Sequence, residues 1–296
     1  MLQPRGIIPP LITPFDANGR INYPVMGRLI DILLDKGVHG IFPLGTTGEF
    51  YAFDNDEYRE VIRYVVQRVN GRVPVYAGAN HITTRGVTEL VKIAEDAGAD
   101  AVSVLTPMFV TQTQNELFRY FETIAASAST PIILYNNRPK TNVHIEPATV
   151  ARLAEIQNII GVKDSTGDMT NTAEYIRLTR HIDNFNVLVG RDTLIFAGLC
   201  YGASGAIATC ANVAPGLVVE IYEKFMAGDY KNALEAQFRL APLRIATNMG
   251  TFPQVIKEAL EILGIPVGKC LDPICELAPE QHEQLIKVLK SMDLPL

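Results

Sequence analysis

The sequence has little of what marks secreted and membrane proteins. It contains four cysteines in 296 residues, and these are too few and too scattered for a disulfide framework. No apolar run approaches the roughly twenty residues that a membrane-spanning helix requires. The first residues also lack the charged start and the small-residue cleavage site of a signal peptide. These absences predict a cytoplasmic protein with reduced thiols and no membrane partner.

Positive charge is also in short supply. Lys and Arg number 26 against 32 Asp and Glu, which makes the formal net charge -6. A chain with this balance has no general attraction for nucleic acid or for anionic membranes. Any site for an anion must therefore be built locally from a few cations.

Several catalytic signatures are missing as well. The five histidines show neither H-E-x-x-H spacing nor another compact ligand cluster, which argues against a metal site and a metal-dependent aldolase or hydrolase. No G-x-S-x-G elbow supports a serine nucleophile. No G-x-G-x-x-G follows a predicted strand, so the sequence does not predict a dinucleotide cofactor.

What the sequence does contain is a regular alternation of short apolar runs with longer stretches of helical periodicity. The runs predict eight strands, at residues 7–13, 40–44, 73–77, 101–105, 131–135, 159–163, 186–189 and 205–209. The periodic stretches predict helices at residues 23–34, 56–66, 88–97, 116–126, 147–154, 171–179, 217–226, 230–247, 254–263 and 279–290.

This alternation favours an α/β fold with a parallel sheet. Eight strand–helix units predict a closed (β/α)8 barrel, or TIM barrel, and a doubly wound open sheet is the alternative. After residue 215 only helical patterns remain. We therefore expect the barrel and its catalytic site within residues 1–224, and a C-terminal helical extension packed on the barrel within residues 225–296.

The run 159–163 ends on a lysine, and a polar turn closed by glycine follows it. Parallel barrels bind their ligands at the carboxyl ends of the strands, which is where Lys163 would lie. Burial there would lower the pKa of Lys163 and leave a neutral amine that can attack a carbonyl to form a Schiff base. The alternative is a structural lysine that ends a strand and points into water.

Polar residues also follow the second and fifth runs. Residues 45–49 read Gly-Thr-Thr-Gly-Glu, which predicts a tight turn whose N–H groups and hydroxyls bind an anion such as a carboxylate. Tyr135 ends the fifth run, either as a packed aromatic or as a proton shuttle, and the cations Arg138 and Lys140 follow it.

The seventh run is followed by charged residues too. Arg191 and Asp192 come after Gly190, and they either line the site or pair with each other on the surface. An amine, a phenol, paired hydroxyls and several cations at one rim suit reaction with a 2-oxo acid.

Three of these segments stand in the order and at the separations seen in the dihydrodipicolinate synthase and N-acetylneuraminate lyase family. They are Gly-Thr-Thr-Gly-Glu at 45–49, Tyr-Asn at 135–136 and Gly-Val-Lys-Asp-Ser-Thr-Gly at 161–167. The resemblance extends over nearly the whole chain, from Gly-Ile-Ile-Pro-Pro at 6–10 to the closing helices. It implies a class I, Schiff-base-forming, pyruvate-dependent aldolase.

The resemblance implies roles for individual residues. Lys163 resembles the lysine that forms an imine with pyruvate or another 2-oxo acid, and Tyr135 resembles the phenol that moves protons. Thr46 and Thr47 match residues that hold the pyruvate carboxylate and link to the tyrosine, and Gly45 opens the same turn.

The resemblance also implies a pocket lining and an assembly. Gly190 and Ile207 fall where backbone groups line the pocket in the family. Family members use no cofactor, and many are tetramers built as dimers of dimers. We therefore expect a homo-oligomer, a tetramer or a dimer, without a cofactor.

Departures from the family pattern concern the second substrate. Phe109 stands where dihydrodipicolinate synthases usually have a tyrosine that reaches a neighbouring subunit's site, and a phenyl ring cannot relay a proton. Lys140 stands where an arginine binds the carboxylate of the aldehyde, with Arg138 displaced two residues earlier. Arg191 and Arg138 predict that the second substrate, or the distal end of a cleaved one, carries negative charge.

The predicted activity is that of a lyase that reversibly joins pyruvate to an aldehyde or cleaves a 2-keto-3-deoxy acid. One alternative is a 4-hydroxy-tetrahydrodipicolinate synthase, which condenses pyruvate with aspartate semialdehyde. Another is a keto-deoxy acid dehydratase that uses the same imine. A non-catalytic sensor of a keto acid is an alternative of a different class.

Overall fold

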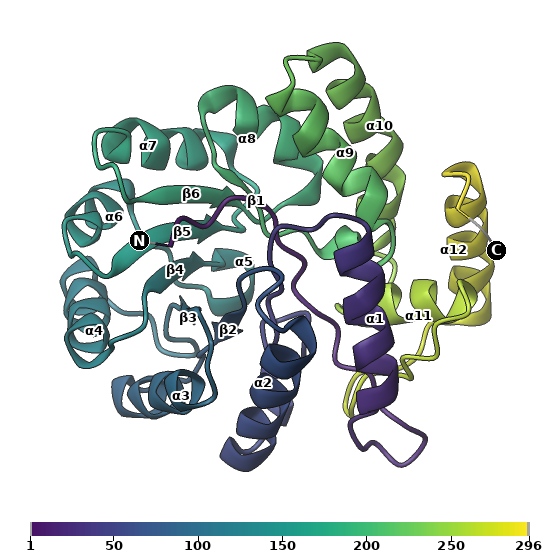
Figure 1. Cartoon of the computed structure of the whole chain (residues 1–296), viewed down its shortest axis with the longest axis horizontal. Coiled ribbons are helices and arrows are strands. Elements are labelled where there is room, and N and C mark those ends of the chain that lie inside the picture. The colour runs from purple at the N-terminus through teal and green to yellow at the C-terminus, as the bar shows by residue number, and fades with distance from the viewer. Residues whose placement is uncertain (1, 295–296) are drawn as a thin grey trace.

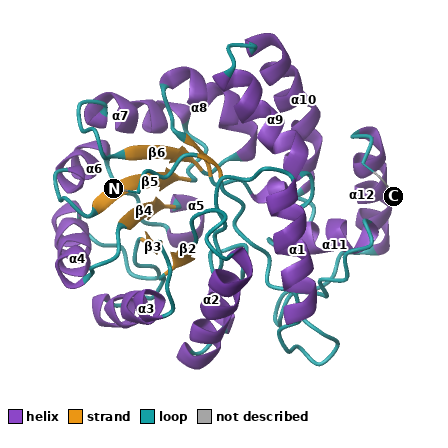
Figure 2. Cartoon of the chain, viewed as in Figure 1, coloured by secondary structure: helices purple, strands orange, loops and turns teal. Residues whose placement is uncertain are grey.

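A computed structural model describes residues 2–294, and its centre is a curled sheet of parallel strands. The strands are β1 (Gly6–Ile7), β2 (Tyr76–Gly78), β3 (Ala101–Leu105), β4 (Ile132–Asn136), β5 (Ile159–Asp164), β6 (Asn186–Val189) and β7 (Gly205–Ala206). Their order in the sheet is β1-β7-β6-β5-β4-β3-β2. Figure 1 shows the helices around the outside of this sheet, and Figure 2 shows the orange strands enclosed by purple helices.

The helices alternate with the strands as the sequence predicts. They are α1 (Tyr23–Asp35), α2 (Asn55–Val69), α3 (Thr84–Asp96), α4 (Gln114–Ser127), α5 (Arg138–Thr141), α6 (Pro147–Ala154), α7 (Met169–Thr179), α8 (Ile195–Tyr201), α9 (Pro215–Met226), α10 (Tyr230–Ala246), α11 (Gln254–Ile262) and α12 (Pro279–Ser291). Side-chain caps define several starts, such as the capping boxes that open α2 at Asp54 and α4 at Thr113. The short helices α5 and α8 were not predicted.

Strand lengths differ from the prediction, and in the first two runs proline interrupts the apolar sequence. β3 and β6 match the predicted ranges, whereas β1 and β7 are two residues long and the run 40–44 forms no strand. Pro9, Pro10 and Pro43 lie in the first two runs, and proline donates no backbone hydrogen bond to a sheet. Single parallel bridges, Pro10 to Phe42 and Ile41 to Val75, join the run 40–44 to its neighbours.

The inside of the curled sheet is filled by a layer of buried side chains. Each of the eight predicted runs contributes one residue to this layer, and the set is Ile8, Phe42, Tyr76, Ala101, Ile133, Ile160, Leu188 and Ile207. A second and larger cluster fills the space between the sheet and the helices. Burial of each large apolar side chain contributes about 1.5–3 kcal/mol, so these two layers form a rigid support for residues at the strand ends.

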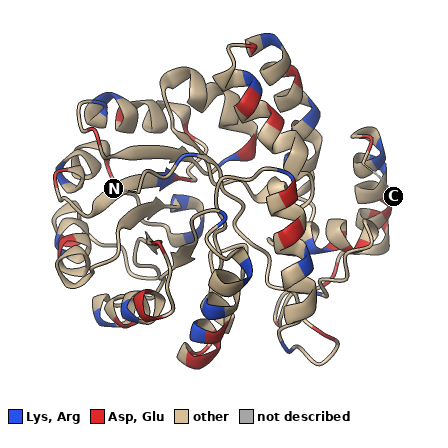
Figure 3. Ribbon diagram, viewed as in Figure 1, with Lys and Arg blue, Asp and Glu red and all other residues tan. Residues whose placement is uncertain are grey.

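Charge is distributed mainly over the outer helices. Figure 3 shows Lys, Arg, Asp and Glu concentrated on the helical ribbons, with few on the strands. Lys163 on β5 is an exception, since its side chain is buried inside the sheet end. Within residues 2–294, no helix is both long enough and apolar enough to cross a membrane.

Candidate active site

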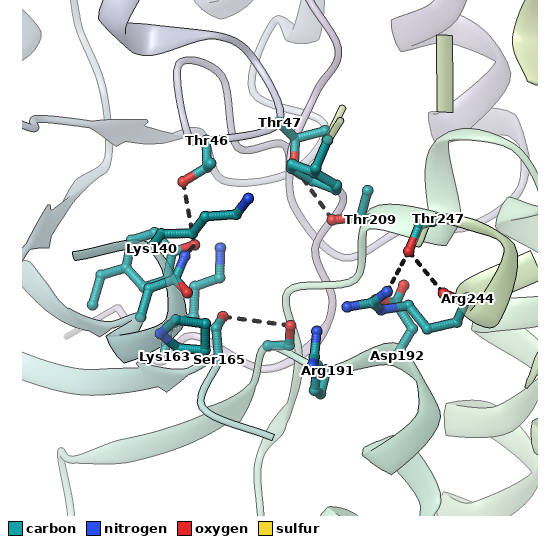
Figure 4. Close-up of a pocket in the computed structure, with 15 residues that line it drawn as sticks. Thr46, Thr47, Lys140, Lys163, Ser165, Arg191, Asp192, Thr209, Arg244 and Thr247 are labelled. Carbon is teal, nitrogen blue, oxygen red and sulfur yellow. Dashed lines mark hydrogen bonds and ion pairs between the residues drawn. The ribbon is translucent and has the colours of Figure 1, made fainter. Parts of the chain in front are cut away.

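A cavity of about 90 Å³ opens at the carboxyl ends of the strands. Figure 4 shows its side chains converging from several strand ends and from the C-terminal part of the chain. The lining residues are Thr46, Thr47, Tyr135, Asn137, Pro139, Lys140, Lys163, Ser165, Gly190, Arg191, Asp192, Thr209, Arg244, Thr247 and Phe252. The carboxyl ends of the strands are where parallel barrels place their active sites.

Lys163 lies at the floor of this cavity, opposite Tyr135 in the register of β4 and β5. Its side chain is 4% exposed. The ammonium nitrogen lies 4.0 Å from the ring centroid of Tyr135 and 4.9 Å from that of Phe42. Lys163 forms no ion pair with a carboxylate of residues 2–294. Burial lowers the pKa of Lys163, and the nearby Tyr135 hydroxyl, with a smaller contribution from the Asp192 carboxylate, opposes that shift without reversing it.

Tyr135 presents its hydroxyl to polar partners inside the cavity. Asn137 Nδ2 donates a hydrogen bond of 2.9 Å to this hydroxyl, and Thr46 Oγ1 lies 3.4 Å from it. Burial alone would raise the pKa of Tyr135, but attraction to the Lys163 charge and hydrogen bonds, including one from Thr46, lower it overall. The phenol can therefore release and recover a proton more easily than an ordinary buried tyrosine.

The turn at residues 45–49 brings two hydroxyls to the opposite side of the cavity. Thr46 faces Tyr135, and Thr47 Oγ1 lies 3.3 Å from Thr209 Oγ1, beyond β7. Gly48 makes this turn possible, because a Cβ atom there would lie 2.9 Å from the carbonyl oxygen of Leu11. The sequence prediction of a tight turn with two inward hydroxyls agrees with this geometry.

A buried network fixes the end of β5 just after the lysine. Asp164 is 2% exposed, and its carboxylate accepts hydrogen bonds from Asn171 Nδ2 at 2.9 Å and Thr172 Oγ1 at 2.7 Å. The backbone N–H of Thr166 donates to the same carboxylate at 3.1 Å. Because its oxygens are occupied by donors from α7 and the following turn, Asp164 orients the strand end that carries Lys163.

One prediction for the residues that follow β6 is wrong. Arg191 and Asp192 do not pair with each other on the surface, because Asp192 is 2% exposed and pairs with Arg244 of α10 at 3.5 Å. Asp192 also accepts a hydrogen bond of 2.7 Å from the backbone N–H of Cys210. Arg191 itself lines the cavity. Among residues 2–294, no group of three or more His, Cys, Asp and Glu side chains is arranged to hold a metal ion.

Four residues that the sequence assigned to substrate binding lie away from the cavity lining. Gly45 sits behind it, over the ring of Phe42, and Ile207 packs in the layer inside the sheet. Arg138 lines a separate depression beside His144. Phe109 is 93% exposed in a single chain. Gly190, Lys140 and Arg191 do line the cavity with the lysine, the tyrosine and both threonines.

Sequence reasoning missed several lining residues. Ser165 could have been found, because it lies two residues after Lys163 in the same turn. Arg244, Thr247 and Phe252 carry no local signal, since they reach the cavity through the packing of the helical C-terminal part of the chain. Only the tertiary structure brings them to a site built from strand ends.

Comparisons with known proteins agree with this arrangement. A model of the dihydrodipicolinate synthetase family matches residues 3–292. The 4-hydroxy-tetrahydrodipicolinate synthase of Methanopyrus kandleri is 41% identical over 99% of this chain and 97% of that protein. The enzyme of the same name from Archaeoglobus fulgidus is 37% identical over 98% of both chains.

Solved structures give the same result. A prophage protein of the dihydrodipicolinic acid synthase family from E. coli K12, solved in complex with pyruvate, is 34% identical, with a TM-score of 0.95 over 98% of this chain and 99% of that chain. Dihydrodipicolinate synthase from Aquifex aeolicus is 35% identical, with a TM-score of 0.94 over 99% of both chains. With a family match that spans the chain from strand β1 to helix α12, this protein belongs to the dihydrodipicolinate synthetase family.

Proposed function

We propose that this lyase forms an imine between Lys163 and pyruvate and uses it to join pyruvate reversibly to an aldehyde. One observation carries the proposal. The Lys163 amine is buried without a carboxylate partner among residues 2–294, and it faces the Tyr135 phenol inside the cavity. A buried lysine of this kind can lose its proton and act as a nucleophile near neutral pH.

The chemistry follows from the neutral amine. Its nitrogen attacks the keto carbon of pyruvate, a proton is added to the oxygen, and loss of water gives the imine. Removal of a proton from the methyl carbon then gives an enamine, whose carbon attacks the aldehyde carbonyl. Hydrolysis of the new imine releases the product and restores Lys163. In the cleavage direction the same steps run in reverse.

Tyr135 is the group that moves these protons. Its hydroxyl lies within hydrogen-bonding reach of Asn137 and Thr46, and its lowered pKa suits both the acid and the base form. Thr46 and Thr47 hold the pyruvate carboxylate with their hydroxyls and the backbone N–H groups of their turn. This arrangement leaves the keto carbon near the amine of Lys163.

Two candidates for the second substrate follow from different observations. The curated relatives are named 4-hydroxy-tetrahydrodipicolinate synthase, which favours aspartate semialdehyde. Lys140 lies in the cavity, whereas Arg138 lines another depression. A lysine cannot bind the carboxylate of aspartate semialdehyde through two parallel hydrogen bonds as an arginine can, which favours instead a 2-keto-3-deoxy acid that the enzyme cleaves to pyruvate and an aldehyde. A dehydratase acting through the same imine would release water from such an acid and no pyruvate.

Turnover by the purified protein tests these activities. Specificity constants are measured for condensation of pyruvate with aspartate semialdehyde and for pyruvate release from a panel of 2-keto-3-deoxy acids. A higher constant for aspartate semialdehyde supports the synthase, and the reverse supports the cleavage activity. Loss of water without pyruvate release supports the dehydratase. Absence of turnover with every substrate contradicts the enzyme proposal and supports a keto-acid sensor.

We also propose that the run 40–44 acts as the eighth strand of a closed barrel, which its bridges to Pro10 and Val75 support. The proposed division is a barrel at 1–224 and a helical extension at 225–296.

Homo-oligomer formation is supported by the exposure of Phe109 and its neighbour Val110, at 93% and 61%. Free thiols at all four cysteines support a cytoplasmic location.

A further inference from the structure

The lining of the cavity is unusually cationic for this chain. The whole sequence carries more acidic than basic residues, with a net charge of -6. Around the cavity the balance is reversed, because Lys140, Lys163, Arg191 and Arg244 line it with Asp192 as the one carboxylate of the lining. In the proposed function, Lys163 forms the imine with pyruvate. The remaining three cations of the lining are Lys140, Arg191 and Arg244.

Arg244 is held at the cavity by contacts that fix its guanidinium. Its side chain is 14% exposed and pairs at 3.5 Å with the buried carboxylate of Asp192. Asp192 is held in turn by the backbone N–H of Cys210, and Arg244 also donates a hydrogen bond to Thr247. A guanidinium has five N–H donors in a fixed plane, so these contacts leave donors available to a ligand in the cavity.

Arg191 reaches the same cavity without an ion-pair partner among residues 2–294. Its side chain packs over Gly167, where a Cβ atom would lie 2.9 Å from Arg191 Nε. Gly167 has a φ of +81°, so both its conformation and the space above it favour glycine. Both guanidinium groups line the cavity, and burial and repulsion from Arg244 lower the pKa of Arg191 against the attraction of Asp192. A bound anion would relieve that repulsion.

The two arginines lie apart from the place proposed for the pyruvate carboxylate. In Figure 4 the threonine turn (residues 45–49) lies at the top of the open space, Arg191 lies near the bottom, and Arg244 lies at the right. The carboxylate of an imine-bound pyruvate is attached to the imine carbon itself, so the threonine turn suffices to hold it. The arginines therefore line a part of the cavity that the pyruvate carboxylate does not need.

We propose that Arg191 and Arg244 form a subsite for the distal anionic group, a carboxylate or a phosphate, of the aldehyde that reacts with the pyruvate imine. Planar guanidinium groups bind both anions through two parallel hydrogen bonds. This inference rests on the proposed function. It assigns to α10 a specificity-determining residue, Arg244, that no sequence motif marks.

Binding to the pyruvyl-enzyme tests the subsite separately from catalysis. The protein is first reduced with borohydride in the presence of pyruvate, which blocks Lys163, and is then titrated calorimetrically with unreactive alcohols. The anionic probes are 4-hydroxybutanoate and glycerol 3-phosphate, and their neutral counterparts are 1-butanol and glycerol. We expect at least one anionic probe to bind more tightly than its neutral counterpart, and the preferred probe identifies the anionic group.

Substitutions then assign the preference to the two arginines. Arg191→Met should weaken binding of the preferred anion by about 10- to 100-fold, because a charge-assisted hydrogen bond is lost, and should leave the neutral probe unchanged. Since Arg244→Met alone would leave Asp192 buried and unpaired, the second variant is Arg244→Met/Asp192→Asn, which removes the ion pair as a unit. It should weaken binding of the same anion by a similar factor.

The matched control is Arg239→Met, which removes one positive charge from the same helix. Arg239 pairs with Glu220 at 3.3 Å and lies outside the cavity lining. Its variant should bind the anion as tightly as the wild-type protein does. Equal affinity for anionic and neutral probes, or equal losses in Arg191→Met and Arg239→Met, overturns the subsite even if the pyruvyl adduct forms. Failure to form the adduct at all contradicts the proposed function instead, and the subsite with it.

Discussion

Two buried lysines in this protein have nearly the same burial and opposite surroundings. Lys163 is 4% exposed and Lys257 is 0% exposed, and each ammonium lies 4.0 Å from an aromatic ring, that of Tyr135 and that of Phe15. Lys257 pairs with Glu49 at 2.7 Å and donates to the carbonyl oxygen of Lys269 at 3.1 Å. Lys163 has a phenol in place of the carboxylate.

The counter-charge therefore distinguishes Lys257 from Lys163, the lysine that we propose to be the nucleophile. Burial lowers the pKa of both lysines, while Glu49 opposes the shift at Lys257 and Tyr135 opposes it at Lys163. If Lys257 lost its proton, Glu49 would remain as a buried carboxylate without a cation, which costs several kcal/mol. If Lys163 loses its proton, no buried carboxylate is left without its partner. Lys163 can therefore become a neutral nucleophile.

The ion pair of Glu49 and Lys257 also lies next to the turn that carries two of the candidate site residues. Glu49 ends the threonine turn with a φ of 57°, and its second carboxylate oxygen accepts a hydrogen bond of 3.0 Å from the backbone N–H of Leu271. Lys257 lies on α11. This pair connects the turn that carries Thr46 and Thr47 to the C-terminal helices.

The largest expected effect is on catalysis by Lys163→Met. Turnover should fall by more than about 10³-fold, because Lys163 supplies the attacking amine in the proposed mechanism. Folding should be preserved, since methionine fills a similar volume and removes a buried ammonium. Steady-state kinetics and thermal unfolding measure the two properties. Residual turnover within tenfold of the wild-type value would contradict the comparison.

Lys257→Met should have its effect on stability. Removing one partner of a buried ion pair leaves Glu49 unpaired and should lower the free energy of unfolding by about 3–5 kcal/mol. The double variant Lys257→Met/Glu49→Gln removes both charges and keeps an acceptor for Leu271, so it should recover most of this loss. Urea unfolding of the three proteins measures these values. A double variant no more stable than Lys257→Met would show that the pair's charges are not the cause.

Tyr135→Phe tests whether the phenol beside Lys163 moves protons. Loss of the hydroxyl should lower the rate of imine formation by about 10²-fold, since a positioned acid–base group typically contributes at least that much. Tyr58→Phe is the control, because the buried hydroxyl of Tyr58 has no hydrogen-bond partner in the described part of the chain. Rapid mixing with pyruvate measures both rates. A Tyr135→Phe rate equal to that of Tyr58→Phe would rule out the proton-transfer role.

The smallest effect should be on the pH dependence of stability. Because the pKa of Lys163 is lower in the folded protein than its ordinary value of 10.5, protons bind preferentially to the unfolded chain between the two pKa values. Wild-type stability should therefore fall, relative to Lys163→Met, as the pH is lowered from 10.5 towards the folded pKa. Urea unfolding of both proteins over this range measures the difference. A difference that does not change with pH would show that the Lys163 pKa is not shifted.

The sequence predicts most of the strand-end site because its residues are local to the strands. Lys163, Tyr135 and the Thr46–Thr47 turn follow from apolar runs that end in polar residues, and the structure brings all of them to one cavity. The lengths of the strands could not be predicted as well. Prolines in the first runs shorten the sheet ladder even where the chain keeps its extended path.

The residues whose position relative to the cavity could not be predicted depend on packing beyond the strands. Arg138 and Lys140 lie two positions apart on the short helix α5, so their side chains point to different sides, and only Lys140 lines the cavity. Arg244 and Phe252 reach the cavity from the helical C-terminal part, which no local motif predicts. Phe109 lies on a loop, and its side chain is exposed to solvent in a single chain.

Peptide mapping after borohydride reduction with pyruvate tests the central claim most directly, because both buried lysines are present in the same molecule. The protein is reduced in the presence of pyruvate, digested, and analysed by mass spectrometry for modified lysines. We expect one pyruvyl adduct per chain, located on Lys163, with Lys257 unmodified. An adduct on Lys257, or undiminished labelling in Lys163→Met, would contradict the conclusion that the missing carboxylate makes Lys163 the nucleophile.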